Sequence, residues 1–212
     1  MFWNVLDKHR QSVLRQLSME PPVPGAYLAG GTAAALQIGH RESIDFDFFS
    51  PIEIQPDDIT RVLQASGVLL VTDIKRGTFH GIWNDVQVTW LHYPFPVIHD
   101  CVKAVDMPGF QAASLVDIAL MKLVAVSQRG ARKDFIDLYA IVQLGISLVD
   151  LLELLPIKYP ETQINLYHII KSLIYFEDAE REPELRILQP LPWESVKSFF
   201  LDVQRSLVDA LH

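Results

Sequence analysis

The spacing of apolar residues changes near the middle of the chain, and this change limits the possible folds more than any other feature. In the first half, short apolar runs and alternating polar and apolar residues predict β-strands. These strands cover residues 26–30, 43–50, 68–76 and 78–93, the last with a turn near Asn84-Asp85. In the second half, apolar residues recur every three or four positions and predict helices. These helices cover residues 115–128, 131–144, 162–176 and 193–211.

Further helices are predicted among the strands of the first half, at residues 2–18, 32–38 and 56–66. The order of elements indicates an α+β fold, with a mixed β-sheet flanked by helices and a helical C-terminal half. We place the division between a core of residues 1–112 and a helical region of residues 113–212. No linker rich in Gly or Ser separates the two parts, so we expect the helical region to pack on the core.

Composition narrows the class of protein. The net charge of −8 over 212 residues argues against wrapping a nucleic acid backbone, which needs a basic face. It leaves room for a small nucleotide, or for an RNA end held through metal ions. The single cysteine, Cys101, excludes an intrachain disulfide framework. The N-terminus does not resemble a signal peptide, and no uncharged apolar run reaches the roughly 18 residues of a membrane span. We therefore expect a cytoplasmic protein with no membrane partner.

Two carboxylates, Asp45 and Asp47, stand one residue apart in the apolar segment of residues 43–50. If the segment is a strand, both side chains project from the same face. Holding two such charges in a partly buried place is costly unless a cation lies between them. Oxygen ligands of this kind suit Mg²⁺. The alternative is a solvated strand face with no ligand.

The turn Gly30-Gly31-Thr32 joins a predicted strand to a predicted helix. Glycine lets backbone N–H groups approach a ligand closely, and a helix N-terminus favours an anion. A phosphate cradle followed by metal-binding carboxylates suits phosphoryl or nucleotidyl chemistry. The alternative is an ordinary turn.

Two blocks of residues resemble a known family. The first is GGT-x(7)-HR-x-S-x-D-x-D-F, which covers residues 30–48, and the second is the segment of residues 120–141. Together with the strands of residues 77–96, they resemble the AbiEii-type nucleotidyltransferases, toxins of bacterial abortive-infection and toxin–antitoxin systems. That family belongs to the DNA polymerase β-like nucleotidyltransferase superfamily. The resemblance implies that residues 1–112 form the nucleotidyltransferase core.

The resemblance implies a role for each matching residue. A nucleoside triphosphate (NTP) would bind against Gly30, Gly31 and Thr32, with Mg²⁺ held by Asp45 and Asp47. The matching residues expected to contact the nucleotide or to act in catalysis are Arg41, Ser43, Lys122 and Asp134.

Arg41, Lys122 and a small basic cluster each have a second interpretation. Arg41 either contacts phosphate or pairs with Asp45, Asp134 or Asp137 to hold a helix against a strand. Lys122 lies inside an apolar helix, where a lysine needs either a route to water or an anion. The basic cluster of Arg129, Arg132 and Lys133 either meets a triphosphate or is simply solvated.

The chain departs from the superfamily pattern at one position. Active members usually carry a third carboxylate on the strand after the pair, and Thr89 stands at that position here. Asp85 is either a shifted substitute or a residue of the Asn84-Asp85 turn, and Asn-Asp suits a hairpin turn.

These observations lead to one main hypothesis and two alternatives. The main hypothesis is a Mg²⁺-dependent nucleotidyltransferase that moves a nucleotide from an NTP to a protein or RNA acceptor, such as a tRNA-like molecule. The resemblance implies that it acts as a toxin with a cognate antitoxin protein. The first alternative is a degenerate nucleotidyltransferase fold that binds nucleotide or protein without catalysis. The second is an antibiotic-modifying enzyme, since an acidic surface suits a cationic drug.

Overall fold

The computed structural model describes residues 1–160 and 162–209. In this part of the chain, seven strands form one mixed sheet in the order β3-β4-β5-β2-β1-β7-β6. The strands are β1 (Tyr27–Ala29), β2 (Phe46–Ser50), β3 (Leu69–Lys75), β4 (Thr78–Trp83), β5 (Val86–His92), β6 (Val102–Lys103) and β7 (Gln111–Ala112). The two short strands β6 and β7 were not predicted from the sequence.

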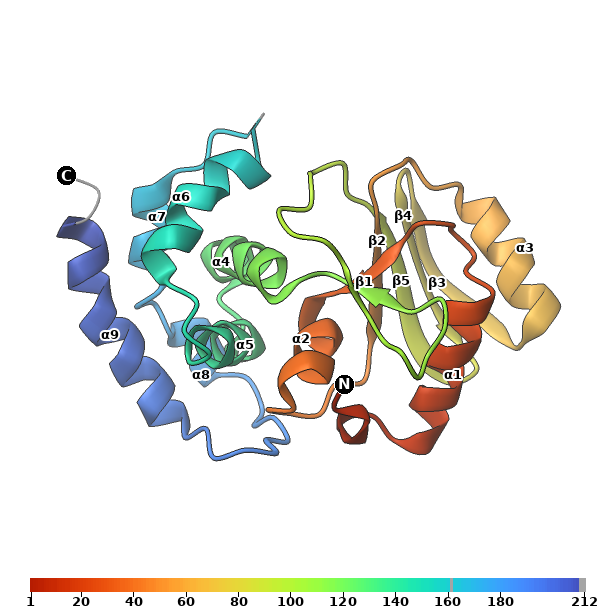
Figure 1. Ribbon diagram of the computed structural model, residues 1–212, viewed down its shortest axis with the longest axis horizontal. Coiled ribbons are helices and arrows are strands. Elements are labelled where there is room, and N and C mark those ends of the chain that lie inside the picture. The colour runs from red at the N-terminus through yellow and green to blue at the C-terminus, as the bar shows by residue number, and fades with distance from the viewer. Residues whose placement is uncertain (161, 210–212) are drawn as a thin grey trace.

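Helices lie on both sides of the sheet and fill the C-terminal half (Figure 1). The helices before β7 are the 3₁₀ helix η1 (Trp3–Val5), α1 (Lys8–Met19), α2 (Gly30–Ile38) and α3 (Pro56–Ser66). The helices after β7 are α4 (Leu115–Arg129), α5 (Arg132–Val142), α6 (Leu148–Lys158), α7 (Leu166–Ser172), α8 (Glu177–Glu180) and α9 (Trp193–Asp209). The expected α+β class, with a mixed sheet and a helical C-terminal half, is confirmed. Within the described ranges, no helix is long and apolar enough to cross a bilayer.

The side chains of strand β2 alternate between the core face of the sheet and the opposite face. Its residues alternate, so that Phe46 and Phe48 are buried while Asp47 and Phe49 face the other way. Phe48 stacks on Trp90 of β5, with ring centroids 5.1 Å apart. This core face is covered by α1 and α3 (Figure 1). Asp47, which the sequence predicts as a functional residue, therefore lies on the opposite face of the sheet.

Two tight turns set the register of the strands β3, β4 and β5. Gly77, with φ of +72°, lies in the turn between β3 and β4. Asn84 and Asp85 have φ of 47° and 61° and form the two-residue turn between β4 and β5. Such left-handed turns match the twist of a hairpin, and Asn and Asp tolerate them. Of the two interpretations of Asp85, the turn residue is the one that the structure shows.

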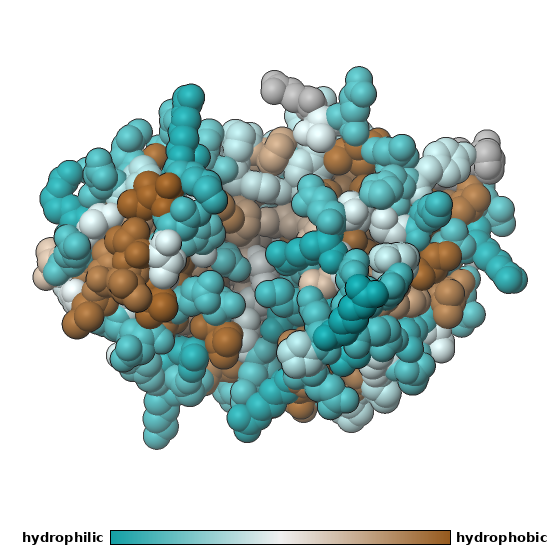
Figure 2. Space-filling model, turned by 180° about the vertical axis from the view of Figure 1, so that it is seen from behind, coloured by the Kyte–Doolittle hydropathy of each residue, from teal (hydrophilic) through white to brown (hydrophobic). Residues whose placement is uncertain are grey.

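The sheet ends at β3, whose outer edge has no neighbouring strand among the described residues. Figure 2 shows an apolar patch on this side of the molecule. The exposed apolar side chains at this edge are Val68, Leu70, Ile74 and Ile82.

Several predicted helices have different bounds in the structure. The helix predicted at residues 2–18 is broken into η1 and α1, because the Asp7 carboxylate accepts a hydrogen bond from the Arg10 N–H (2.8 Å) and starts a new helix. The helix predicted at residues 162–176 shortens to α7, and residues 210–211 of the last predicted helix lie outside the described residues. Helix α6 was missed because Pro156, which the sequence suggests as an interruption, lies inside it.

A late segment of the chain returns to the region around α2. Arg41 and Ile187 form an antiparallel bridge. The Leu188 N–H donates to the His40 carbonyl (2.9 Å), and the Gln189 amide donates to the Ile38 carbonyl (3.0 Å). The connection between α8 and α9 is thereby fixed to the N-terminal half.

Candidate active site

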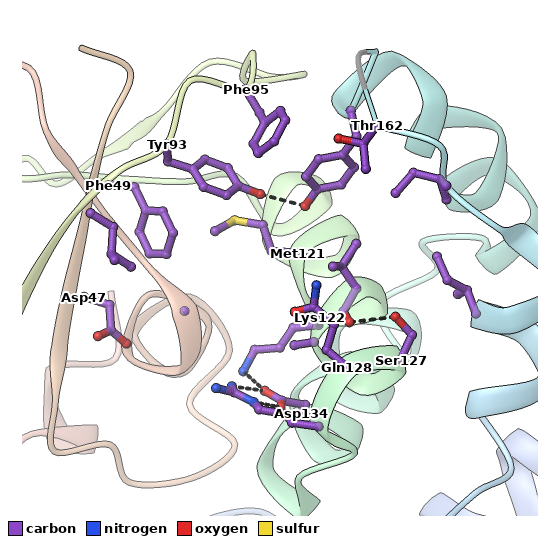
Figure 3. A pocket seen from close by; sticks show the side chains of 18 of the residues that line it. Asp47, Phe49, Tyr93, Phe95, Met121, Lys122, Ser127, Gln128, Asp134 and Thr162 are labelled. Atoms are coloured by element: carbon purple, nitrogen blue, oxygen red, sulfur yellow. Dashed lines mark hydrogen bonds and ion pairs between the residues drawn. The ribbon is translucent and has the colours of Figure 1, made fainter. Parts of the chain in front are cut away.

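A cleft of about 710 Å³ lies between the sheet and the helical half. Figure 2 shows the surface hollowed between these two sides of the molecule. In Figure 3, Asp47 and Phe49 lie on the sheet side, while Lys122, Ser127 and Gln128 come from α4 across the cleft. The cleft also reaches the segment between α6 and α7, including Thr162. Both halves of the chain therefore build this cavity.

Asp47 lines the cleft beside the start of α2. A Cβ atom added to Gly30 would lie 3.1 Å from the Asp47 Oδ2 atom, so the carboxylate lies against this glycine. Gly30 has φ of +64°, which an L side chain rarely adopts. The glycine therefore leaves room beside the Asp47 carboxylate, where a side chain would otherwise lie. This place is at the N-terminus of α2, where backbone N–H groups lack helical partners.

Asp45 lies directly before β2 rather than inside it. Burial raises the pKa of Asp47, and the neighbouring Asp45 carboxylate raises it further. The two carboxylates therefore repel each other, and a cation between them would relieve that repulsion. Among the described residues, no group of three or more His, Cys, Asp and Glu side chains forms a complete metal cage. Two carboxylates still fit Mg²⁺, which takes one or two from a protein and completes its shell with water and phosphate.

Thr32 and Ser43 hold the glycine turn against the segment before β2. The Thr32 hydroxyl hydrogen-bonds the Ser43 hydroxyl (2.7 Å) and donates to the Asp45 carbonyl. Neither residue lines the cleft. In this arrangement they position Gly30 and Asp45, and their expected contact with a nucleotide stays a prediction.

Arg41 is buried under the same turn. Its guanidinium donates to both carboxylate oxygens of Asp137, at 2.6 Å and 2.9 Å. The His40 Nε2 atom lies 2.8 Å from the same carboxylate. A Cβ atom on Gly31 would lie 2.1 Å from an Arg41 nitrogen, so only glycine leaves room for the guanidinium. Of the two roles expected for Arg41, the structure shows the ion pair, which holds α5 against α2. Arg41 does not line the cleft, and its expected contact with phosphate stays a prediction.

Lys122 meets its anions inside the protein. Its ammonium lies 2.8 Å from Asp134 and 2.6 Å from Asp137, and all three side chains are buried. Burial of Asp137 would raise its pKa, but Lys122 and Arg41 outweigh that effect and hold the pKa well below its usual value. The roles of Lys122 and Asp134 toward a nucleotide stay predictions. Asp134 and Asp137 act here as anchors for cations.

Arg129 is the cation with the most exposure in this network. Its guanidinium donates to both oxygens of Asp134 (2.7 Å and 3.0 Å), yet 57% of its side chain remains exposed. It lines the cleft together with Lys122 and Asp134. Lys133 is close enough to Asp47 to lower its pKa. Two members of the predicted basic cluster therefore lie near the carboxylates, while Arg132 turns away to the Ala179 carbonyl.

Four polar residues cross the sheet in one line, and we call them the cross-strand row: Asp47, Thr89, His80 and Asp73. Asp47 pairs with Thr89 between β2 and β5, and Thr89 pairs with His80 between β5 and β4. Asp73 follows on β3, opposite His80. Paired residues share a face of a sheet. The position of the third carboxylate is thus directly beside Asp47, and Thr89 occupies it.

Aromatic side chains form the far end of the cleft. The Tyr93 and Tyr159 hydroxyls lie 2.6 Å apart and join the end of β5 to the end of α6 (Figure 3). Phe95 packs edge-on against both rings, with centroids 4.9 Å and 4.8 Å away. Phe49 packs edge-on against Tyr93. The cleft therefore has a charged end at Asp47 and an aromatic end.

The fold and this site together define a nucleotidyltransferase-like protein. The family model of the nucleotidyl transferase AbiEii toxin, a type IV toxin–antitoxin system protein, matches residues 92–206. The chain belongs to this family and is therefore a nucleotidyltransferase. The match begins at the end of β5, so the assignment of Asp45 and Asp47 depends on the residues and geometry described above.

One sequence relative and two solved structures are similar to this chain. An uncharacterized protein of Aquifex aeolicus (strain VF5) is 37% identical over 177 residues, covering 82% of this chain and 84% of the relative. An H. pylori protein assigned as a nucleotidyltransferase has a TM-score of 0.56 at 17% identity, covering 99% of this chain and 97% of its own. MenT4, a nucleotidyltransferase toxin of Mycobacterium tuberculosis H37Rv, has a TM-score of 0.54 at 12% identity, covering 95% and 89%. At these identities the two solved structures show a shared fold only.

His80 and the central place of Asp137 in the buried network were not predicted from the sequence. The signal for His80 was present, because counting back from the Asn84-Asp85 turn pairs it with Thr89. Asp137 was only one of several candidate partners for Arg41. Nothing in residue spacing shows that one carboxylate receives three cationic or imidazole groups.

Proposed function

We propose that this nucleotidyltransferase uses Mg²⁺ to transfer a nucleotide from an NTP to an RNA or protein acceptor, as the toxin of a toxin–antitoxin pair. The observation that carries the proposal is the position of Asp47. It lies against Gly30 at the start of α2, next to Asp45 and opposite the cations of α4 and α5. This is the arrangement needed for a metal-bound triphosphate.

Each group of residues has a distinct part in the proposed reaction. The N–H groups at the start of α2 receive phosphate oxygens, since a helix N-terminus favours anions. Arg129 and Lys133 offset the negative charge of the triphosphate from the other side of the cleft. Asp45 and Asp47 would hold Mg²⁺, which when bound aligns the attacking hydroxyl and neutralises the pyrophosphate. Arg41 and Asp137 act indirectly, because they fix α2 against α5.

The family supports the toxin role and a neutralising antitoxin in general. The acceptor would approach from the helical side, where Ser127, Gln128 and Arg129 line both the cleft and an adjoining cavity of about 500 Å³. The division into a nucleotidyltransferase core of residues 1–112 and an acceptor-facing region of residues 113–212 is part of this proposal.

The test is a transfer assay with a matched control. The wild-type protein, an Asp45→Asn/Asp47→Asn variant and an Asp57→Asn/Asp58→Asn control are each incubated with labelled NTPs, Mg²⁺ and total cellular RNA. The control removes the same charge from the exposed start of α3. We expect label on RNA or on protein with the wild type and the control only. Equal labelling by the Asp45→Asn/Asp47→Asn variant would refute the metal site.

A second function, nucleotide binding without transfer, is favoured by one observation. Thr89 replaces the third carboxylate beside Asp47, so a complete three-carboxylate metal site is absent at this position. In the same assay, Mg²⁺-dependent NTP binding by a wild type that labels no acceptor supports this second function.

A further inference from the structure

The cross-strand row raises the question of what replaces the missing carboxylate chemically. Thr89 is buried, and its hydroxyl has no acidity suited to proton transfer near neutral pH. His80, on the next strand, lines the same cleft as Asp47. An imidazole is the side chain whose ordinary pKa best suits proton transfer at neutral pH.

The hydrogen bond between His80 and Thr89 orients the imidazole. The His80 Nδ1 atom lies 3.1 Å from the Thr89 Oγ1 atom. When Nδ1 carries the proton and donates it to Thr89, the Nε2 atom is a free acceptor. No hydrogen bond from Nε2 to another described residue competes with this role. With Nδ1 as the donor, Thr89 holds the imidazole in the form that a base requires.

Asp47 and His80 lie two strands apart on the face of the sheet that lines the cleft. Neighbouring strands lie about 4.8 Å apart, so the backbones at Asp47 and His80 are separated by roughly 10 Å. Asp47, Thr89 and His80 all line the cleft here, so an acceptor hydroxyl bound over Thr89 would lie between the imidazole and the carboxylate. His168, another histidine of the cleft, lies on the helical wall and has its Nε2 atom 3.1 Å from the Ser127 carbonyl. His80 is therefore the better placed imidazole.

The last member of the row places a second carboxylate beside His80. Asp73 stands opposite His80 and is paired with Lys75 (2.7 Å), whose ammonium lowers the pKa of Asp73. The carboxylate therefore stays ionised at neutral pH and adds a negative charge beside His80. The charged groups around His80 are then Asp73 and Lys75 on one side and Asp47 on the other.

We propose that His80 is the general base of the transfer reaction, in place of the third carboxylate. This inference rests on the proposed function. The acceptor oxygen attacks the α-phosphorus of the NTP, and its proton passes to the His80 Nε2 atom. A bond forms between the acceptor oxygen and the α-phosphorus, and the bond from the α-phosphorus to the bridging oxygen breaks. Pyrophosphate leaves with that electron pair, and the imidazolium returns the proton to solvent.

The test compares His80→Gln with His92→Gln, which replaces a histidine of β5 outside the cleft lining. The measurements are the single-turnover transfer rate and the Kd of a non-hydrolysable NTP analogue with Mg²⁺. We expect His80→Gln to lower the rate about 100-fold, the usual size for a lost general base, without changing the Kd. We expect His92→Gln to behave as the wild type. Circular dichroism checks folding, and His80→Asn repeats the measurement with a shorter side chain.

A rescue experiment distinguishes a histidine that acts as the base from one that only supports the structure. In the His80→Gln background, Thr89→Asp places a carboxylate beside Asp47 and should restore most of the lost rate. A side chain that only supports the sheet would not be rescued in this way. If the wild type is active and His80→Gln is equally active, the role of His80 as base is refuted while the proposed function stands. The same conclusion follows if Thr89→Asp fails to rescue His80→Gln. A wild type that transfers nothing refutes the proposed function and, with it, the base.

Discussion

Asp137 offers the sharpest test of how the site is held together. Its carboxylate accepts two hydrogen bonds from Arg41, lies 2.6 Å from Lys122 and contacts His40, all in the buried interior. Replacing it with Asn keeps the shape but removes the charge. Arg41, Lys122 and Arg129 would then face Asp134 as the remaining carboxylate of this network.

The expected loss follows from the cost of an unpaired buried charge. Breaking a buried ion pair by removing one partner costs about 3–5 kcal/mol. For a chain of this size, each kcal/mol lowers the melting temperature by about 2–4 °C, so Asp137→Asn should melt about 10 °C lower. The Asn amide still accepts a hydrogen bond, which favours the lower end of the range.

Urea unfolding followed by circular dichroism measures the loss directly. Asp58→Asn is the control, because Asp58 pairs with Arg61 at the exposed surface and such pairs contribute about 0–1 kcal/mol. The double variant Arg41→Met/Asp137→Asn should lose less than the sum of its single variants, since the pair is removed together. A loss for Asp137→Asn no larger than for Asp58→Asn would refute the reasoning.

Three further predictions concern other parts of the molecule. Gly31→Ala should destabilise by about 1–3 kcal/mol in urea, because the new methyl group displaces Arg41. Lys158→Met should cost about 3 kcal/mol in the same assay, since it leaves the buried Asp117 without its cation (2.6 Å). The unfolding free energy should also fall as the pH drops below about 4, the ordinary carboxyl pKa, because Asp117 and Asp137 have lowered pKa values in the folded state. Their stabilisation is complete above the unfolded pKa and is lost as they protonate. A pH series of urea curves measures this, and a flat profile down to pH 3 would contradict it.

Local patterns predicted most elements of the fold. The alternation around Asp47 predicted β2, and the Asn84-Asp85 pair predicted the turn before β5. Both signals lie within a few residues, where backbone preference and burial agree. The helix boundaries near Asp7 and Pro156 were predicted less well. The spacing of apolar residues does not show that Asp7 caps a new helix or that α6 continues through Pro156.

The site was predictable only where its parts are close in sequence or follow from register. The glycine turn and Asp45-Phe46-Asp47 were identified from the residues and from the family resemblance. The contact of Lys122 with Asp137 was not, and Asp137 was one of three candidate partners for Arg41, since these contacts depend on how α2, α4 and α5 pack. Periodicity shows which side of a helix is buried, but it does not show which partner the buried charge meets.

The return of residues 187–189 to the segment after α2 has a consequence for how the protein is made. The Gln189 side chain and the Ile38 carbonyl are separated by 151 positions in the chain. Contacts between such distant residues raise the contact order and slow folding. During synthesis, the segment that carries Arg41 gains these neighbours only after residues 187–189 have emerged. For an enzyme of a toxin family, a nascent chain would therefore lack its finished site until residues 187–189 have been made.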